Sequence, residues 1–193
     1  MKSNRFLFLL LVFLICNIHL HAQVKKIDTT LKIGTSGYRV SCSNKNASDN
    51  IISITTIGFT QGARGGSFSS RGFLTKAEIG NLNDDAIPEL LLYVFGVPNV
   101  KTGKAICMTV INNSIIPVFF PDIYDDPVLR AGYKGTDEFS IRNGILTRNF
   151  PLYKDGDADD MPTGGKRTIQ YQMLKRDDGS PLFKILRSYD SAQ

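Results

Sequence analysis

Polar side chains that can bind a cation recur at alternate positions between residues 81 and 89. Asn81, Asn83, Asp85 and Glu89 fall in the register of a calcium-binding loop, in which one tight turn wraps hard oxygen ligands around the ion. Asn81 stands where such loops usually have aspartate, and Ala86 stands where they have glycine. The sequence therefore gives these four residues as candidate metal ligands. A turn in which the same side chains bond the backbone is the simpler alternative.

Histidine chemistry is confined to the start of the chain. The two histidines, His19 and His21, both lie within the first 22 residues. Residues 23–193 therefore offer no imidazole as a general base or zinc ligand. Catalysis there would depend on carboxylates, lysine or tyrosine, and no local pattern singles out a carboxylate pair. We predict that the protein is not an enzyme.

The first 22 residues have the pattern of a secretory signal peptide. Lys2 and Arg5 precede an apolar run over residues 6–15, and Ala22 provides a small residue for cleavage. The run is too short to form a stable membrane anchor. We predict a periplasmic or secreted protein in which residues 1–22 are the signal and residues 23–193 form a single β domain.

Removal of that signal leaves a mildly basic chain. The sequence has 23 basic and 18 acidic side chains, and Lys2 and Arg5 belong to the signal. The net charge of the mature part is then about +3, which is too small to indicate a nucleic-acid partner. The sequence does not define the oligomeric state.

Two cysteines remain after the signal, Cys42 and Cys107. An oxidising compartment would allow one disulfide between them. The alternative is two separate buried thiols, because sequence alone does not place their Cα atoms within bonding distance.

The elements that must position these residues are predicted to be strands. Short segments rich in β-branched and aromatic residues alternate with Gly, Asn and Asp clusters, which is typical of an all-β protein with little helix. We predict a one-domain antiparallel β-sandwich, with a central strand over the unbroken apolar run 90–95. Asn143-Gly144 and Asn112-Asn113 predict hairpin turns. The predicted strands are 30–33, 38–43, 51–57, 89–95, 105–111, 115–119, 138–142, 145–150, 168–174 and 182–188.

Four segments in the second half resemble the periplasmic inhibitors of invertebrate-type lysozyme (the PliI-like family). They are GNLNDDAIPEL at 80–90, GYKGTDEF at 132–139, RNFPLYKDGD at 148–157 and PTGGKRTIQY at 162–171. The four occur in the same order as in the family and span about half of the chain. The resemblance implies a secreted β-sandwich that inserts a loop into the catalytic cleft of a lysozyme, without catalysis of its own.

The family's inhibitory loop lies between the two strands that are here 89–95 and 105–111. Its Ser-Gly-x-Tyr motif is matched by Thr102-Gly103, with Ala105 in the tyrosine position. The resemblance implies that Lys101, Thr102, Gly103 and Lys104 form the contact loop. Its lysines suit the acidic cleft of a lysozyme or other glycosidase.

A second function remains open on the sequence alone. The protein would be a calcium-stabilised extracytoplasmic β module that binds glycan or an envelope protein, with the ligand set of residues 81–89. Apart from calcium, no cofactor is expected.

Overall fold

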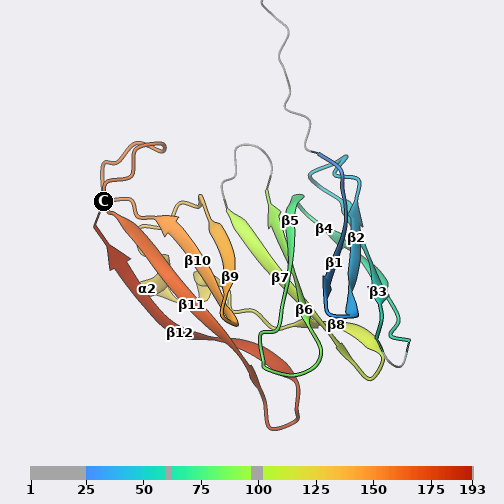
Figure 1. Cartoon of the computed structure of the whole chain (residues 1–193). Helices are drawn as coiled ribbons and strands as arrows, with labels where there is room; N and C mark the ends of the chain where they lie inside the picture. Colours follow the sequence, from blue (N-terminus) through green and yellow to red (C-terminus); the bar gives the residue numbers. More distant parts are fainter. Residues whose placement is uncertain (1–24, 60–61, 97–101, 193) are drawn as a thin grey trace, which may run out of the picture.

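Antiparallel strands make up most of the computed structural model, which describes residues 25–59, 62–96 and 102–192. Twelve strands in this described part form three four-stranded sheets. Figure 1 shows them as three layers, which we call the N-terminal, middle and C-terminal sheets. The predicted all-β, sandwich-like class is confirmed, with a third layer added.

Each sheet is built from strands that follow one another in sequence. The N-terminal sheet has the order β1 (Ile27–Ile33), β2 (Ser36–Cys42), β3 (Asn50–Ile57) and β4 (Gly66–Ser70). The middle sheet has the order β5 (Phe73–Gly80), β6 (Glu89–Phe95), β7 (Gly103–Ile111) and β8 (Ser114–Val118). The C-terminal sheet has the order β12 (Pro181–Ser191), β11 (Lys166–Lys175), β10 (Ile145–Pro151) and β9 (Glu138–Arg142).

Two hydrophobic cores lie on the two faces of the middle sheet. Strand β6 supplies both, because Leu90 and Leu92 pack toward the N-terminal sheet while Leu91 and Tyr93 pack toward the C-terminal sheet. All four side chains are buried. The prediction of a central strand over this apolar run is confirmed. Burial on both faces explains why the run shows no alternation of apolar and polar residues.

Two hairpin turns follow their sequence signals. Asn143 and Gly144 have φ of 50° and 72°, and Asn112 and Asn113 have φ of 49° and 61°. Positive φ at both central residues is the geometry of a type I′ turn. The turns connect β9 to β10 and β7 to β8.

The strands β4 and β5 are not among the predicted ones. Both lie between the predicted strands 51–57 and 89–95. Strand β4 has the sequence GSFSS, whose glycine and serines give a weak strand propensity. Its pairing with β3 places it in the sheet nevertheless.

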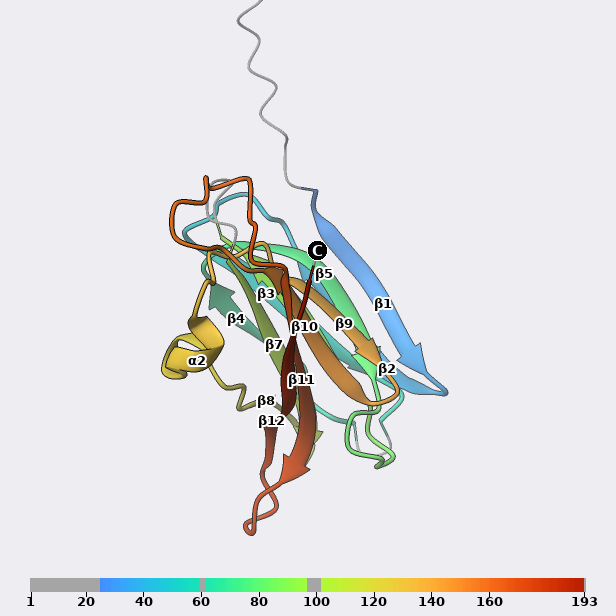
Figure 2. The same cartoon turned by 90° about the vertical axis from the view of Figure 1, so that its left-hand side faces the viewer.

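The segment between β8 and β9 holds the short helices. A 3-10 turn, η1, spans Ile123–Asp125, and the helix α2 spans Pro127–Arg130. The side chain of Asp122 caps η1, and that of Asp126 caps α2. Figure 2 shows α2 on one side of the sheets, away from β1. Within the part of the chain that the structure describes, no helix has the length and apolar character needed to span a membrane.

Cys42 and Cys107 are separate buried thiols. Cys42 belongs to the core between the N-terminal and middle sheets, whereas Cys107 belongs to the core on the other face of the middle sheet. Of the two alternatives that the sequence left open, the structure shows the separate thiols and not the disulfide, because the middle sheet lies between the two side chains. Burial raises the pKa of the Cys107 thiol, which keeps it protonated and unreactive.

Candidate functional site

The start of β7 carries the described part of the predicted contact loop. We call Thr102, Gly103 and Lys104 the β7 rim. Lys104 is exposed, Thr102 is half-buried and Gly103 is buried. Gly103 pairs with Phe95 at the end of β6, so the rim begins where these two strands part. Lys101, the remaining predicted contact residue, lies outside the described residues.

Gly103 has no room for a side chain. A Cβ atom at this position would lie 2.7 Å from Cε1 of Phe95 and 3.0 Å from Cε2 of Phe139. The backbone N–H of Gly103 donates a hydrogen bond to Oδ2 of Asp137 at 2.7 Å. Aromatic rings and a buried carboxylate therefore hold the backbone of the rim from two sides.

Asp137 belongs to a buried network with Arg148 and Tyr133. Nε of Arg148 donates to Oδ1 of Asp137 at 2.7 Å, and the hydroxyl of Tyr133 donates to Oδ2 at 2.6 Å. A second guanidinium nitrogen of Arg148 donates to the Tyr133 hydroxyl oxygen at 2.8 Å. The side chain of Asp137 is 0% exposed and that of Arg148 is 6% exposed. With the Gly103 bond, the carboxylate accepts three hydrogen bonds, as a buried charge requires.

The surroundings fix the protonation states of Arg148 and Tyr133. Burial by itself would lower the pKa of Arg148, but the hydrogen bond and charge of Asp137 outweigh it and raise that pKa. Burial raises the pKa of Tyr133, and the nearby Arg148 opposes that effect only in part. Arg148 is thus permanently charged and Tyr133 neutral near pH 7. The network positions the rim and is not suited to proton transfer.

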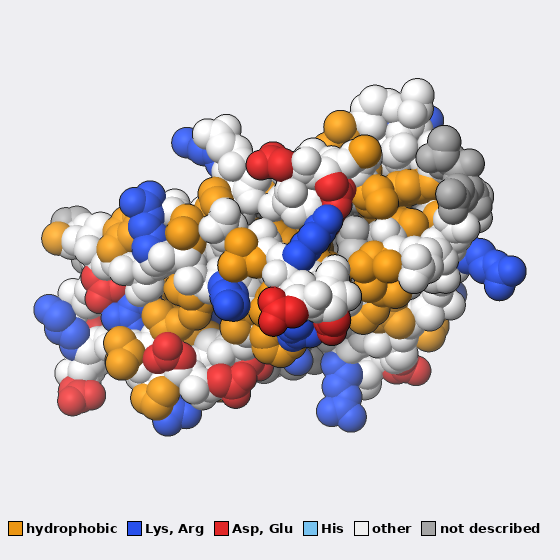
Figure 3. Space-filling view, turned by 90° about the horizontal axis from the view of Figure 1, so that it is seen from below, with side chains coloured by type: hydrophobic (Ala, Val, Ile, Leu, Met, Phe, Trp, Pro, Cys, Tyr) orange, Lys and Arg blue, Asp and Glu red, His pale blue; other side chains and the backbone are white. Residues whose placement is uncertain are grey.

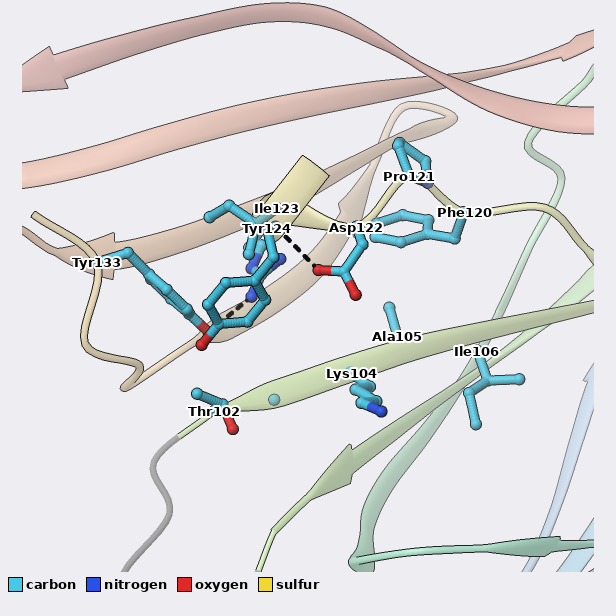
Figure 4. A pocket seen from close by; sticks show the side chains of 12 residues that line it. Thr102, Lys104, Ala105, Ile106, Phe120, Pro121, Asp122, Ile123, Tyr124 and Tyr133 are labelled. Carbon is cyan, nitrogen blue, oxygen red and sulfur yellow. Dashed lines mark hydrogen bonds between the residues drawn. The ribbon is translucent and has the colours of Figure 1, made fainter. Parts of the chain in front are cut away.

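A pocket of about 190 Å³ opens beside the rim (Figure 4). One side is β7 from the rim to Ile106, and the other is the segment 120–124. Tyr133 and Arg148 also line it, so the buried network forms part of its wall. The rings of Tyr124 and Tyr133 meet edge to face with centroids 5.8 Å apart.

The predicted calcium ligands take up a different arrangement. Asn81, Asn83 and Asp85 lie in one loop, but they bond to one another. The side-chain amide of Asn81 donates to the carbonyl of Asp85 at 2.7 Å, and that of Asn83 donates to the carboxylate of Asp85 at 2.8 Å. The Asp85 carboxylate also accepts the backbone N–H of Ile87 at 2.7 Å. These are the contacts of an Asx-rich turn.

Glu89, the fourth predicted ligand, is fully buried at the start of β6. Its carboxylate accepts the backbone N–H of Leu82 at 2.8 Å and the hydroxyl of Thr109 at 3.2 Å. Burial raises its pKa to about 7, although these two hydrogen bonds oppose the rise. Over the described ranges, no group of three or more His, Cys, Asp or Glu side chains is placed to hold a metal ion.

The sequence did not identify the network behind the rim. Tyr133 and Asp137 were visible only within a segment that resembles the inhibitor family. The position of Arg148 could have indicated a buried network. Arg148 alternates with the buried Leu146 and Phe150 along β10 and therefore points into the core. An arginine on an apolar strand face requires a buried acidic or hydrogen-bonding partner.

Comparison with protein-family models gives no matching family. Comparison with curated proteins finds no matching relative.

Proposed function

We propose that the protein is an exported, non-catalytic binding protein that presents the β7 rim to the acidic cleft of a glycosidase, a lysozyme in the first place. The observation that carries the proposal is the fixed backbone of Gly103, which Asp137 holds from within the core. A binding loop whose base is fixed before contact loses less conformational entropy on binding.

The charge and exposure of the rim support an acidic partner. Lys104 is exposed, and its ammonium group is free to approach a carboxylate. The hydroxyl of Thr102 is a second donor on the same edge. Figure 3 views the molecule from below, the end away from the start of β7, and there Lys and Arg side chains are interspersed with Asp and Glu. The end opposite the rim therefore has mixed charge, and it is not the surface that we assign to the acidic partner.

The state of the carboxylates near the rim supports binding without catalysis. The side chain of Asp137 is fully buried and accepts three hydrogen bonds, so it is not placed to attack or protonate a substrate. Asp122 accepts the backbone N–H of Tyr124 as the cap of η1. A glycosidase needs two carboxylates that face one substrate bond, and neither of these two is arranged for that role.

Inhibition of lysis tests the proposal. The purified chain without residues 1–22 would be titrated into lysozymes of the invertebrate, chicken and goose types, with the rate of cell-wall lysis as the readout. We expect one type to be inhibited at micromolar protein or below. The variant Thr102→Ala/Lys104→Ala should lose inhibition by about tenfold or more, since two direct contacts are removed.

The control is Lys32→Ala, which removes an exposed lysine from β1. It has the same effect on net charge as Lys104→Ala and should inhibit like the parent protein. Equal loss in both variants would mean that net charge, and not the rim, determines inhibition. Absence of inhibition of all three types would reject the proposal.

A further inference from the structure

We propose that the pocket between β7 and the segment 120–124 binds a single neutral sugar ring, a pyranose. We call it the rim pocket. This goes beyond the proposed function, because the ligand is a small molecule and its binding requires no glycosidase. The inference rests on the size of the pocket, its aromatic lining and the carboxylate of Asp122 at its edge.

The size and lining suit one ring. A volume of about 190 Å³ is below the range of roughly 300–1,000 Å³ typical of drug-sized ligands. The deep part is apolar, since the lining residues Ala105 and Ile123 are buried. Phe120 and Tyr124 add aromatic surface nearer to solvent. Apolar depth with polar groups at the edge is the usual form of a small-ligand site.

The aromatic wall is exposed and yet held in place. Tyr124 is 54% exposed, and its ring packs edge to face against Tyr133. Tyr133 is in turn fixed by its hydrogen bonds with Asp137 and Arg148. Figure 4 shows the tips of Tyr124 and Tyr133 together on one wall, above Thr102. A fixed ring offers its face to the C–H groups of a sugar, and its hydroxyl offers a hydrogen bond.

The charges at the pocket disfavour an anionic ligand. Figure 4 shows the Asp122 carboxylate directed toward β7, whereas the side chain of Lys104 points to the other side of that strand. Arg148 in the wall is neutralised by Asp137. An anion would therefore be repelled by Asp122. A polyhydroxyl ligand can donate its hydroxyl groups to the same carboxylate.

Titration with monosaccharides, followed by amide NMR shifts, tests the inference. The probes are N-acetylglucosamine and glucose as neutral rings, with glucuronate as the anionic ring. We expect the amides of Thr102, Lys104 and Tyr124 to shift with a neutral ring, with a Kd of about 1–10 mM. The anionic ring should bind at least about fivefold more weakly, because it would meet the Asp122 carboxylate.

Two variants separate the pocket from unspecific binding. Tyr124→Ala removes the exposed ring and should weaken the neutral sugar by about fivefold or more. Tyr189→Ala removes a tyrosine of similar exposure, 47%, from β12 and should leave the Kd within twofold. Far-ultraviolet circular dichroism would verify that both variants are folded. A third variant, Asp122→Asn, keeps the η1 cap and should also weaken binding of the neutral sugar.

The inference is overturned by any of three results. They are no saturable shift with either neutral ring at 50 mM (about fivefold above the upper end of the expected Kd range), equal affinity for the anionic and the neutral rings, and an unchanged Kd in Tyr124→Ala. Because no lysozyme is present, these results leave the proposed inhibition untouched, and failure of inhibition leaves the sugar site untouched.

Discussion

Arg148 connects the core of the C-terminal sheet to the β7 rim. Its guanidinium packs near the rings of Tyr133, Phe139 and Phe150, with centroid distances of 5.1, 5.4 and 5.8 Å. Its charge is balanced by Asp137, which in turn holds Gly103. A buried ion pair is a costly way to stabilise a core. Its value here is that one carboxylate fixes three separate segments, namely the rim, the loop before β9 and strand β10.

Removal of one partner of this pair should destabilise the fold strongly. We expect Asp137→Asn and Arg148→Met each to lower the free energy of unfolding by about 3–5 kcal/mol, because each leaves a buried polar group without its partner. The double variant should lose less than the sum of the two. Urea denaturation provides the measurement.

The pair of Arg39 and Asp28 is the matched control. It is also an Arg–Asp pair, but it lies on the surface, with side chains 59% and 37% exposed and two hydrogen bonds between them. Asp28→Asn and Arg39→Met should each lower the free energy of unfolding far less than the variants of the buried pair, because water and salt screen an exposed ion pair. Equal costs at the buried and exposed pairs would contradict the role assigned to Asp137.

Glu89 should make stability depend on pH. Burial raises its pKa from 4.5 in the unfolded chain to about 7 in the fold, so the folded state holds the proton more tightly. The resulting stability is fully present below pH 4.5 and is lost as the pH rises through 7. The loss amounts to about 3 kcal/mol.

A series of denaturation curves from pH 5 to pH 8 measures this effect. The variant Glu89→Gln stays neutral and should flatten the decline over that range. If the free energy of unfolding changes with pH equally in the parent protein and in Glu89→Gln, then Glu89 is ionised throughout this pH range.

At the scale of elements, local signals predicted most of the strands and turns. Asn143-Gly144 and Asn112-Asn113 tolerate positive φ, and each pair forms the turn that this predicts. Strand β6 was predictable because its unbroken apolar run indicates burial on both faces. Strand β4 was not, because its small polar residues become a strand only through pairing with β3.

Gly103→Ala tests the packing at the start of β7. The added Cβ would meet the rings of Phe95 and Phe139, and overpacking of this kind costs about 1–3 kcal/mol. We expect a lower Tm and a shifted Thr102 amide resonance. Gly34→Ala is not a suitable control because Gly34 has a positive φ. Gly66→Ala is suitable, since its nearest neighbour would be 3.5 Å away. An unchanged Tm in Gly103→Ala would mean that the rim moves freely.

The loop 81–89 distinguishes the two functions that the sequence left open. Its Asx contacts already occupy the carboxylate of Asp85, so we expect 5 mM calcium to change the Tm by less than about 1 °C relative to chelator. Asp85→Ala should lower the Tm in both conditions. A rise of several degrees with calcium, lost in Asp85→Ala, would favour the calcium-stabilised module instead.

At the scale of the whole molecule, the arrangement of sheets determines what sequence could not. Arg148 and Asp137 are 11 positions apart, yet Gly103, which completes their network, is 34 positions before Asp137. Only the packing of the middle and C-terminal sheets brings them together. The packing of the sheets also keeps the two cysteines apart, because it places Cys42 and Cys107 in different cores. Local patterns predicted the strands, and the site between strands came from the structure.

The central proposal is that the protein binds an acidic cleft through the β7 rim. The most direct test is calorimetric binding to an invertebrate-type lysozyme and to a variant of it in which the two catalytic carboxylates are replaced by amides. We predict at least about tenfold weaker binding to the amide variant, equivalent to about 1.4 kcal/mol, and no such difference for Thr102→Ala/Lys104→Ala. Equal affinity of the parent protein for both lysozymes would contradict the account.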